Sequence, residues 1–431
     1  MAQFYTHIFS GLEARAFLRE HNFKPSQTSA QISFELIDGL SETSLTARAQ
    51  SFLTHSTRLE NQIRFPLPER VERSFKSLAA DLFQQGIHIS IEKIELHHLD
   101  TVSIEFFRSL GIAVLQIDSP SQHSHLLNIL NQDELNLLEF LKNPRKNLAE
   151  ILSFAQKRIY SCDYRTALNI FNLVEIEYLD RADFYYLKGL CHNYFNQTEL
   201  SEVCFEKMRQ IGSPEVKANA GYVLSMLYLR LHPQELQDLN RAETYLEDAY
   251  HLLQSLPSTE NSIFQTVFNR NGYALCLYRK GLVHEAVEML ERGISQLRAF
   301  KNRKHDLHQS VLLYNALQCY RTLKRYSDCE RTTRELLALD PLFPEYHLEH
   351  GKTLLEQSKF SEARKYFRHA AQLDPLIAEA HALIAYSYFA EDNFALAALY
   401  YRAALKLKPH SLQFQEDAFY CESQLASEAC L

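Results

Sequence analysis

Glycine and proline are scarce in this chain. Its 431 residues include only 11 glycines and 12 prolines, the two residues that build most tight turns. Leucine, alanine, tyrosine and phenylalanine are abundant instead, which favours long helices over a turn-rich β architecture. Because a chain of this length with 46% hydrophobic residues exceeds one ordinary core, we expect a mainly α fold, in two domains or in an extended repeat array.

Charge and hydropathy exclude two classes of partner. The chain has 45 basic and 53 acidic side chains and a formal net charge of −8, so it lacks the basic excess that binds nucleic acid through counterion release. No stretch approaches the roughly 18 uninterrupted apolar residues of a membrane span. The N-terminal segment also lacks an apolar run followed by a small-residue cleavage site. These absences predict a cytoplasmic protein without a nucleic-acid partner or a membrane span.

Motifs for catalysis and for cofactor binding are missing as well. The sequence contains no GxxxxGK[S/T] or GxGxxG phosphate loop, no GxSxG nucleophile turn and no HExxH zinc motif. Its eight cysteines form no CxxC pair, and Cys191, Cys276 and Cys319 fit better as small packing residues. We therefore predict no catalytic residue, no cofactor and no metal site. Five histidines come closest to a metal cluster, but they lack an acidic or cysteine partner at ligand spacing: His88, His97, His98, His123 and His125.

A repeat of 34 residues is present in the C-terminal part of the chain. Pro341, Pro375 and Pro409 follow one another at this interval, after the similar segments ELLALDP, HAAQLDP and ALKLKP. Proline cannot continue a helix, so each one marks a helix end and a fresh start. Small residues recur where the two helices of a unit would cross closely, and an aromatic residue recurs at the turn between them. The small residues are Cys329, Ala363, Ala397, Gly351 and Ala385, and the aromatic residues are Tyr326, Phe360 and Phe394.

This order of small and aromatic positions resembles the tetratricopeptide repeat family, whose helix-turn-helix units have the same length. The resemblance is strong over residues 310–411 and weaker further back, where one loop is lengthened by LHPQELQDLN and one second helix is overlong. It implies an α-solenoid of about seven units over residues 146–411, closed by a capping helix over 412–431.

Stacked helix pairs form a superhelix whose concave face is lined by the first helix of each pair. In one subclass of the family, lysine, arginine and asparagine on this face clamp a carboxylate, but the matching positions here are Leu348, Glu349, Ala382 and Leu383. The groove is instead aromatic, apolar and amide-lined, which suits a protein or peptide client with apolar anchors. Some of its tyrosines have an alternative role as contacts between neighbouring units. The predicted partner-binding residues are Tyr186, Leu190, Asn193, Tyr194, Asn271, Leu275, Tyr278, Tyr314, Asn315, Gln318, Arg321, Lys352, Leu355, Tyr386 and Phe389.

Residues 1–145 lack this repeat. Period-two alternation predicts strands over 31–38 and 87–96, and a short apolar run predicts another over 112–118. A helix that begins after Asp100 separates the last two strands, with the aspartate as its cap. Strand, helix and strand in so short a stretch indicate a βαβ unit with parallel pairing. We therefore predict a small α/β domain that ends at residue 145.

Three classes of function remain. The leading hypothesis is a protein–protein interaction scaffold, an adaptor or chaperone that binds its client in the concave groove. The alternative is a signalling or transcription-related regulator, in which the N-terminal domain senses and the array transmits. An enzyme with its active site in residues 1–145 is a third hypothesis, but no convergent set of catalytic side chains is recognisable there. The sequence leaves open whether the chain associates with itself.

Overall fold

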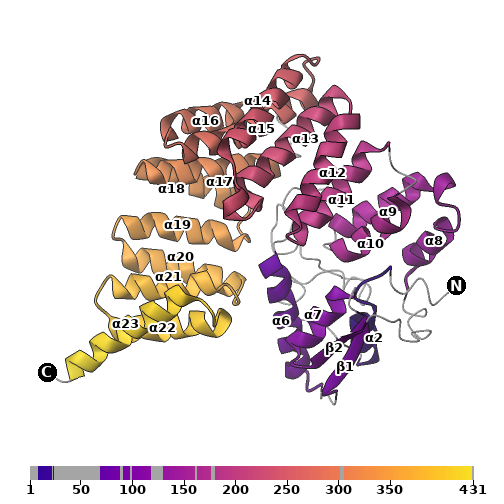
Figure 1. Cartoon of the computed structure of the whole chain (residues 1–431). Helices are drawn as coiled ribbons and strands as arrows, with labels where there is room; N and C mark the ends of the chain where they lie inside the picture. Colours follow the sequence, from indigo (N-terminus) through magenta and orange to yellow (C-terminus); the bar gives the residue numbers. More distant parts are fainter. Residues whose placement is uncertain are drawn as a thin grey trace. The chain divides into compact units, whose positions relative to one another are not determined.

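The computed structural model describes residues 8–21, 23, 68–87, 91–97, 100–117, 130–160, 163–175, 180–300 and 305–429. The described residues fall into two compact units, the first ending at residue 300 and the second beginning at residue 305. Helices make up most of both units, and within the described chain strands occur only in the N-terminal region (Figure 1). The mainly α fold expected from the sequence is confirmed.

A parallel pair of strands lies in the N-terminal region. Strand β1 (Lys93–His97) pairs with β2 (Ala113–Ile117), with Ile94 opposite Val114. Helix α7 (Thr101–Ser109) connects the two strands, as parallel pairing requires. The βαβ unit predicted from the alternation of apolar residues is therefore confirmed.

An aromatic core holds this α/β region together. Helices α2 (Leu12–Glu20) and α6 (Pro68–Gln84) both contact α7. Phe106 and Phe107 of α7 are almost completely buried, and their rings meet that of Phe17 on α2 edge to face, at centroid distances of 5.9 and 5.6 Å. Such aromatic pairs add about 0.5–1.5 kcal/mol each to the hydrophobic stabilisation.

Some predictions for the N-terminal region concern residues outside the described part of the chain. They are the strand over 31–38 and the histidines His88, His98, His123 and His125. Among the residues that the structure does describe, no group of three or more histidine, cysteine, aspartate or glutamate side chains is arranged to hold a metal ion.

Asp100 caps one helix and also binds the residues that precede another. Its carboxylate accepts a hydrogen bond from the backbone N–H of Ser103, at 3.2 Å, and so fulfils the predicted capping role at the start of α7. The same carboxylate accepts hydrogen bonds from the backbone N–H of Gly11, at 2.6 Å, and from the hydroxyl of Ser10, at 3.1 Å. Burial raises the pKa of Asp100, and these hydrogen bonds oppose that effect. One carboxylate therefore fixes the starts of α2 and α7 relative to each other.

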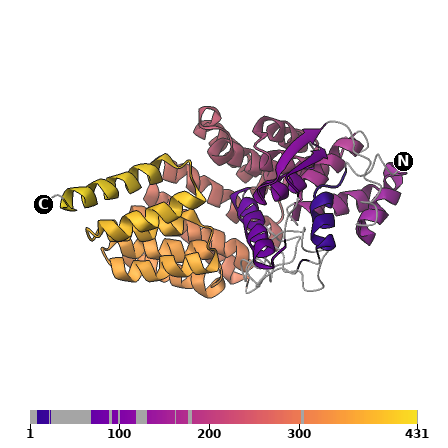
Figure 2. The same ribbon diagram turned by 90° about the horizontal axis from the view of Figure 1, so that it is seen from below.

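From residue 148 to residue 429, the described chain consists of seven consecutive helix pairs and one further helix (Figures 1 and 2). The predicted number of units and the capping helix are therefore confirmed. In the first unit the pairs are α9 (Leu148–Tyr160) with α10 (Tyr164–Val174), α11 (Ala182–Tyr194) with α12 (Thr198–Ile211), α13 (Pro214–Met226) with α14 (Leu239–Gln254), and α15 (Glu260–Arg279) with α16 (Val283–Ala299). In the second they are α17 (Asp306–Thr322) with α18 (Tyr326–Leu339), α19 (Pro344–Glu356) with α20 (Phe360–Leu373), and α21 (Ala378–Phe389) with α22 (Phe394–Leu407), followed by α23 (Leu412–Ala429).

The two predicted irregularities of the array are both present. After α13 the chain forms a π-helical turn over Leu227–Leu231 and a short 3-10 turn over Gln234–Leu236 before α14 begins. The 3-10 turn lies in the predicted long loop, and the π-helical turn ends at Leu231, where that loop begins. In the next pair, α15 has 20 residues and α16 has 17, so the predicted overlong second helix is also found.

Glycine is required at the crossing of two of the helix pairs, α11 with α12 and α19 with α20. A Cβ atom added to Gly351 would lie 2.3 Å from the ring of Phe367, and one added to Gly189 would lie 2.4 Å from the ring of Phe205. Both phenylalanine rings are almost completely buried, so neither can move aside without disturbing its neighbours. The small residue that the spacing predicts at the crossing therefore packs, at Gly351, directly against a buried aromatic ring.

The three cysteines predicted to be packing residues are buried: Cys191, Cys276 and Cys319. Burial raises the pKa of Cys276 and of Cys319 to about 11, and it raises the pKa of Cys191 well above the usual value. The thiols therefore remain protonated at neutral pH and behave as small apolar side chains.

The N-terminal region and the first helix pair share a core inside the first unit. Phe9 and Leu12 belong to the same hydrophobic cluster as Leu137 of α8 (Gln132–Phe140) and Ile151 of α9. The domain boundary predicted between residues 145 and 146 lies within this unit and stays a prediction. Experiments on the array are for this reason best made with the full chain.

Candidate functional site

The first helices of the second unit form a continuous row. Helix α17 meets α19 where the rings of Tyr314 and Tyr346 lie 6.2 Å apart, and α19 meets α21 through an ion pair of 2.6 Å between Lys352 and Glu379. Helix α23 occupies the next first-helix position, because it begins 34 residues after α21. We refer to this surface as the first-helix face and define it by Tyr314, Gln318, Arg321, Lys352, Tyr386, Phe389 and Tyr420.

Four of the predicted partner-binding residues converge on one buried carboxylate. Glu349, on α19, is only 3% exposed. Its carboxylate forms ion pairs with Arg321 and, at 2.9 Å, with Lys352. It also accepts hydrogen bonds from the Gln318 amide, at 3.0 Å, and from the Tyr314 hydroxyl, at 3.4 Å. Burial by itself raises the pKa of Glu349, but Lys352 and Arg321 outweigh this effect and hold the pKa below its usual value.

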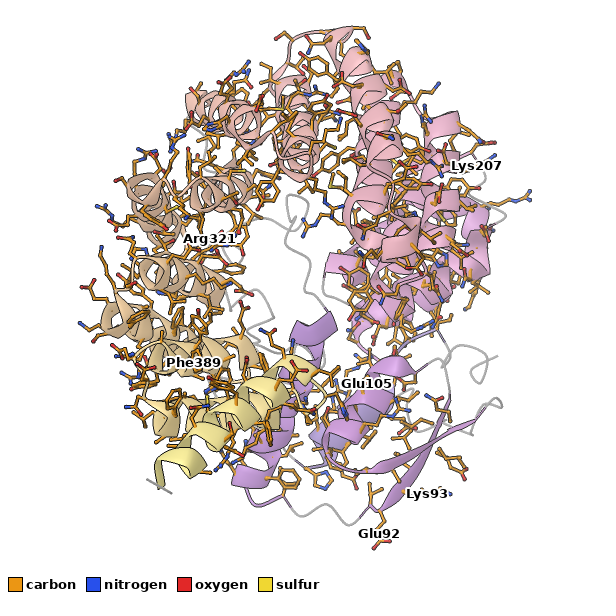
Figure 3. The ribbon with its side chains drawn as sticks, turned by 60° about the vertical axis from the view of Figure 1, so that its left-hand side comes forward. Glu92, Lys93, Glu105, Lys207, Arg321 and Phe389 are labelled. Atoms are coloured by element: carbon orange, nitrogen blue, oxygen red, sulfur yellow. The ribbon has the colours of Figure 1, made fainter. Side chains whose placement is uncertain are left out.

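The two cations of this network are each shared between two carboxylates. Lys352 Nζ also lies 2.6 Å from Glu379, and Arg321, labelled in Figure 3, places its Nε 3.5 Å from Glu356. The charges therefore alternate along the row in the order Glu356, Arg321, Glu349, Lys352 and Glu379. The central carboxylate is buried, whereas the side chains of Glu356 and Glu379 are 38% and 54% exposed. The network therefore ends on both sides in an acidic side chain that is exposed to water.

Aromatic side chains continue the first-helix face beyond this network. On α21 the rings of Tyr386 and Phe389 lie 6.1 Å apart, and the ring of Phe389, labelled in Figure 3, lies 5.8 Å from that of Tyr420 on α23. Tyr386 is 46% and Tyr420 is 49% exposed. Partly exposed aromatic rings in contact with one another are the side chains that most often anchor a protein partner.

Sequence reasoning missed four members of this arrangement: Glu349, Glu356, Glu379 and Tyr420. In the sequence, Glu349 was considered only because it occupies a position where the carboxylate-clamping subclass has a different residue. Tyr420 was assigned to a capping helix. The signal for Tyr420 was the repeat itself, since it stands 34 residues after Tyr386. Applying the period to the last helix would have found this residue.

The remaining predicted residues lie in packed surroundings. In the second unit, Leu355 packs against the core and Asn315 is partly buried. In the first unit, Tyr194 stacks on Tyr164 at 4.0 Å, and Asn271 is only 7% exposed. These two side chains fill contacts between helices, which is the alternative role considered for the groove. The others in the first unit are partly buried: Tyr186, Leu190, Asn193, Leu275 and Tyr278. Contact of these residues with a client stays a prediction.

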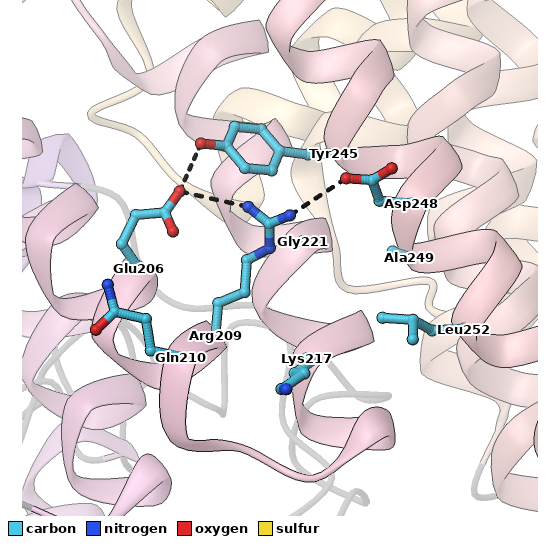
Figure 4. A pocket seen from close by; sticks show the side chains of 9 residues that line it. All are labelled: Glu206, Arg209, Gln210, Lys217, Gly221, Tyr245, Asp248, Ala249 and Leu252. Carbon is cyan, nitrogen blue, oxygen red and sulfur yellow. Dashed lines mark hydrogen bonds and ion pairs between the residues drawn. The ribbon is translucent and has the colours of Figure 1, made fainter.

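A polar pocket of about 320 Å³ lies among α12, α13 and α14 in the first unit. Figure 4 shows that Tyr245 and Arg209 both reach Glu206, with 2.6 Å between the Tyr245 hydroxyl and the carboxylate. Arg209 also pairs with Asp248, at 3.2 Å. Because these charged side chains pair with one another, the pocket has little preference for a positively or a negatively charged ligand.

In the part of the chain that the structure describes, no helix combines the length and the apolar character needed to cross a membrane.

Comparison with known families identifies the repeat. Residues 348–411, which include α20 and α21, match the tetratricopeptide repeat family. Residues 348–411 therefore contain tetratricopeptide repeats. The resemblance drawn from the spacing of prolines, small residues and aromatic residues is thereby confirmed. Arrays of tetratricopeptide repeats present extended binding surfaces, so the broad class of function is that of a protein–protein interaction scaffold.

Comparisons with solved structures give matches of low sequence identity. The chain is similar to a signal transduction ATPase with numerous domains from Pyrococcus horikoshii, which carries a tetratricopeptide repeat sensor, with 14% identity and a TM-score of 0.48 over 79% of this chain. The match covers 46% of that protein, so this chain spans about half its length. It is also similar to Pseudomonas aeruginosa pilF, with 20% identity and a TM-score of 0.41 over 56% of this chain and 97% of that one. For the Cut9–Hcn1 assembly of the APC/C the identity is 12% and the TM-score 0.43, over 88% of this chain and 59% of that one. A search of curated protein sequences gave no match.

Proposed function

We propose that the chain is a scaffold of the adaptor or chaperone type, which holds a segment of a client protein on the first-helix face. The observation that carries this proposal is the run of partly exposed aromatic side chains on α21 and α23, beside a charge network whose two cations are already paired with carboxylates. Tyrosine and phenylalanine supply large contact areas and dominate the energetics of many interfaces. Repeat arrays use extended faces of this kind to bind other chains.

The side chains differ in how well they serve a test of this proposal. Tyr314 donates to the buried Glu349 and packs against Tyr346, so its replacement would disturb the fold together with the surface. Tyr386 and Tyr420 are about half exposed, at 46% and 49%. Replacing them removes contact area from the first-helix face and leaves the core intact.

The full chain with both Tyr386→Ala and Tyr420→Ala is expected to lose the client that the unchanged chain retains in affinity capture from native lysate. Each aromatic anchor of an interface contributes about 2 kcal/mol, so the double replacement should weaken binding by a factor on the order of a hundred or more. The retained proteins are quantified by mass spectrometry, and the helical circular dichroism of the variant should match that of the unchanged chain.

Leu399→Ala provides the matched control. Leu399 is 58% exposed and lies on α22, the second helix of its pair, so its loss removes exposed apolar surface away from the first-helix face. The control variant should retain the client at the level of the unchanged chain. If the double tyrosine variant also retains it at that level, the client does not bind the first-helix face and the proposal is wrong.

A further inference from the structure

The charge network on the first-helix face has an excess of negative charge. It contains three carboxylates, Glu349, Glu356 and Glu379, and two cations, Arg321 and Lys352. Summing their formal charges gives −1, and the two carboxylates at the ends are the members that are most exposed to water. Any charged group that approaches this part of the face from solvent therefore meets carboxylates first.

No cation of this network is left for an acidic ligand. The side chains of Arg321 and Lys352 are only 19% and 25% exposed, and each contacts two carboxylates. A carboxylate of a client would have to displace one of these partners and would be repelled by the other acids. The Tyr314 hydroxyl lies in the same acidic surroundings. Burial raises its pKa most, and the negative charge of Glu349 raises the pKa further.

The adjoining aromatic rings suit a basic ligand as well as an apolar one. The faces of tyrosine and phenylalanine rings attract lysine and arginine side chains, and their edges and faces bury aliphatic or aromatic anchors. The rings of Tyr386, Phe389 and Tyr420 follow one another at 6.1 and 5.8 Å. An acidic stretch and an aromatic stretch thus lie next to each other on one face.

We infer that the first-helix face takes a basic segment of a client protein, in which lysine or arginine residues alternate with aliphatic or aromatic anchors. This inference rests on the proposed scaffold function, since it names the chemistry of the client held on the same face. The cationic side chains of the segment lie against Glu356 and Glu379, and its anchors lie against Tyr386, Phe389 and Tyr420. A second copy of this face is a poor occupant, because it would bring the same excess of acidic groups.

The test uses the full chain and three fluorescently labelled synthetic peptides of equal length, with binding followed by fluorescence polarisation. The first peptide alternates lysine with leucine and phenylalanine. The second has glutamate in place of every lysine, and the third keeps the lysines but has serine in place of leucine and phenylalanine. We expect the first to bind about tenfold or more tightly than either of the others. Its affinity should fall as the salt concentration rises, because salt screens exposed charges.

Reversing one charge on the protein distinguishes an effect of the first-helix face from an effect of the net charge of the whole chain. Glu379→Lys is expected to lower the affinity of the chain for the lysine peptide about tenfold and to raise its affinity for the glutamate peptide. Glu362→Lys changes the net charge of the chain by the same amount, but Glu362 is exposed on α20, the second helix of its pair. The control variant should bind all three peptides as the unchanged chain does.

Two results would overturn the inference. One is that the glutamate peptide binds as tightly as the lysine peptide; the other is that Glu379→Lys has no more effect than Glu362→Lys. If either occurs while the captured client still depends on Tyr386 and Tyr420, the scaffold function stands and only the basic character of the client is wrong. If the captured client is indifferent to both tyrosines, the scaffold proposal itself fails.

Discussion

Replacing Glu134 with alanine is expected to lower the free energy of unfolding of the first unit by about 3–5 kcal/mol. The Glu134 side chain is completely buried, and its carboxylate pairs with Arg15 of α2 at 2.7 Å and with Arg158 of α9 at 2.8 Å. The two arginine side chains are only 7% and 8% exposed. Without Glu134, Arg15 would lose its buried ionic partner, so its guanidinium would remain buried without close compensation.

Urea unfolding of the full chain, followed by far-UV circular dichroism, measures this loss, and hydrogen exchange of α2, α8 and α9 localises it. Glu139→Ala is the matched control on the same helix. Glu139 is 68% exposed and pairs with Lys142, so its removal should change the stability by less than about 1 kcal/mol. Equal effects of the two replacements would show that the buried ion pairs do not stabilise the first unit.

The same carboxylate gives the stability a pH dependence of defined sign. Burial alone raises the pKa of Glu134, but Arg15 and Arg158 outweigh it, so the folded-state pKa lies below the usual value of 4.5. The stabilisation is therefore complete above about pH 4.5 and is lost as the pH falls through the folded-state pKa. The difference in stability between the unchanged chain and Glu134→Ala should stay constant near neutral pH and shrink only in acid. A difference that shrinks already near neutral pH would contradict this assignment.

Gly351→Val is expected to destabilise the second unit by about 2–3 kcal/mol. An added Cβ would lie 2.3 and 2.7 Å from two ring atoms of Phe367, closer than any van der Waals contact permits. The ring is completely buried, so α19 and α20 would have to move apart. The gain in helix propensity on replacing glycine is smaller than this strain, at about 1 kcal/mol or less.

A double-mutant cycle tests the stated cause of the Gly351→Val effect. In a Phe367→Leu background the ring is gone, so Gly351→Val should destabilise by about 1 kcal/mol less than it does in the unchanged chain. Thermal and urea unfolding of the four chains supply the coupling energy. Additive effects would mean that the contact between these two positions is not the source of the destabilisation.

Much of the fold was predictable from local signals. Proline at a fixed interval ends a helix whatever surrounds it, and small residues at the same interval mark the positions where the two helices of a unit cross. The βαβ unit followed from alternation in one stretch and a short apolar run in the other, and the capping role of Asp100 followed from its place just before α7. Each of these signals can be interpreted within one helix, one strand or one repeat unit. No knowledge of contacts between distant parts of the chain is needed.

The candidate site was only partly predictable, because its chemistry arises between units. Tyr194 and Tyr386 are both first-helix tyrosines, yet Tyr194 stacks on Tyr164 whereas Tyr386 is 46% exposed. Nothing in the sequence distinguishes them, since the neighbour that covers one ring belongs to another helix. The position of Glu349 was identified from the sequence, but its role as the meeting point of four side chains was not.

The sequence by itself determined the repeat period, the seven helix pairs and the parallel strand pair, because these features depend on residues close together in the chain. Only the tertiary structure decided which aromatic rings remain exposed and which charges meet. Arg321 and Glu349 are 28 residues apart and Arg15 and Glu134 are 119 apart, and contacts over such separations depend on how whole helices stack. The same stacking pairs the cations of the first-helix face with carboxylates and leaves Glu356, Glu379, Tyr386 and Tyr420 partly exposed to solvent.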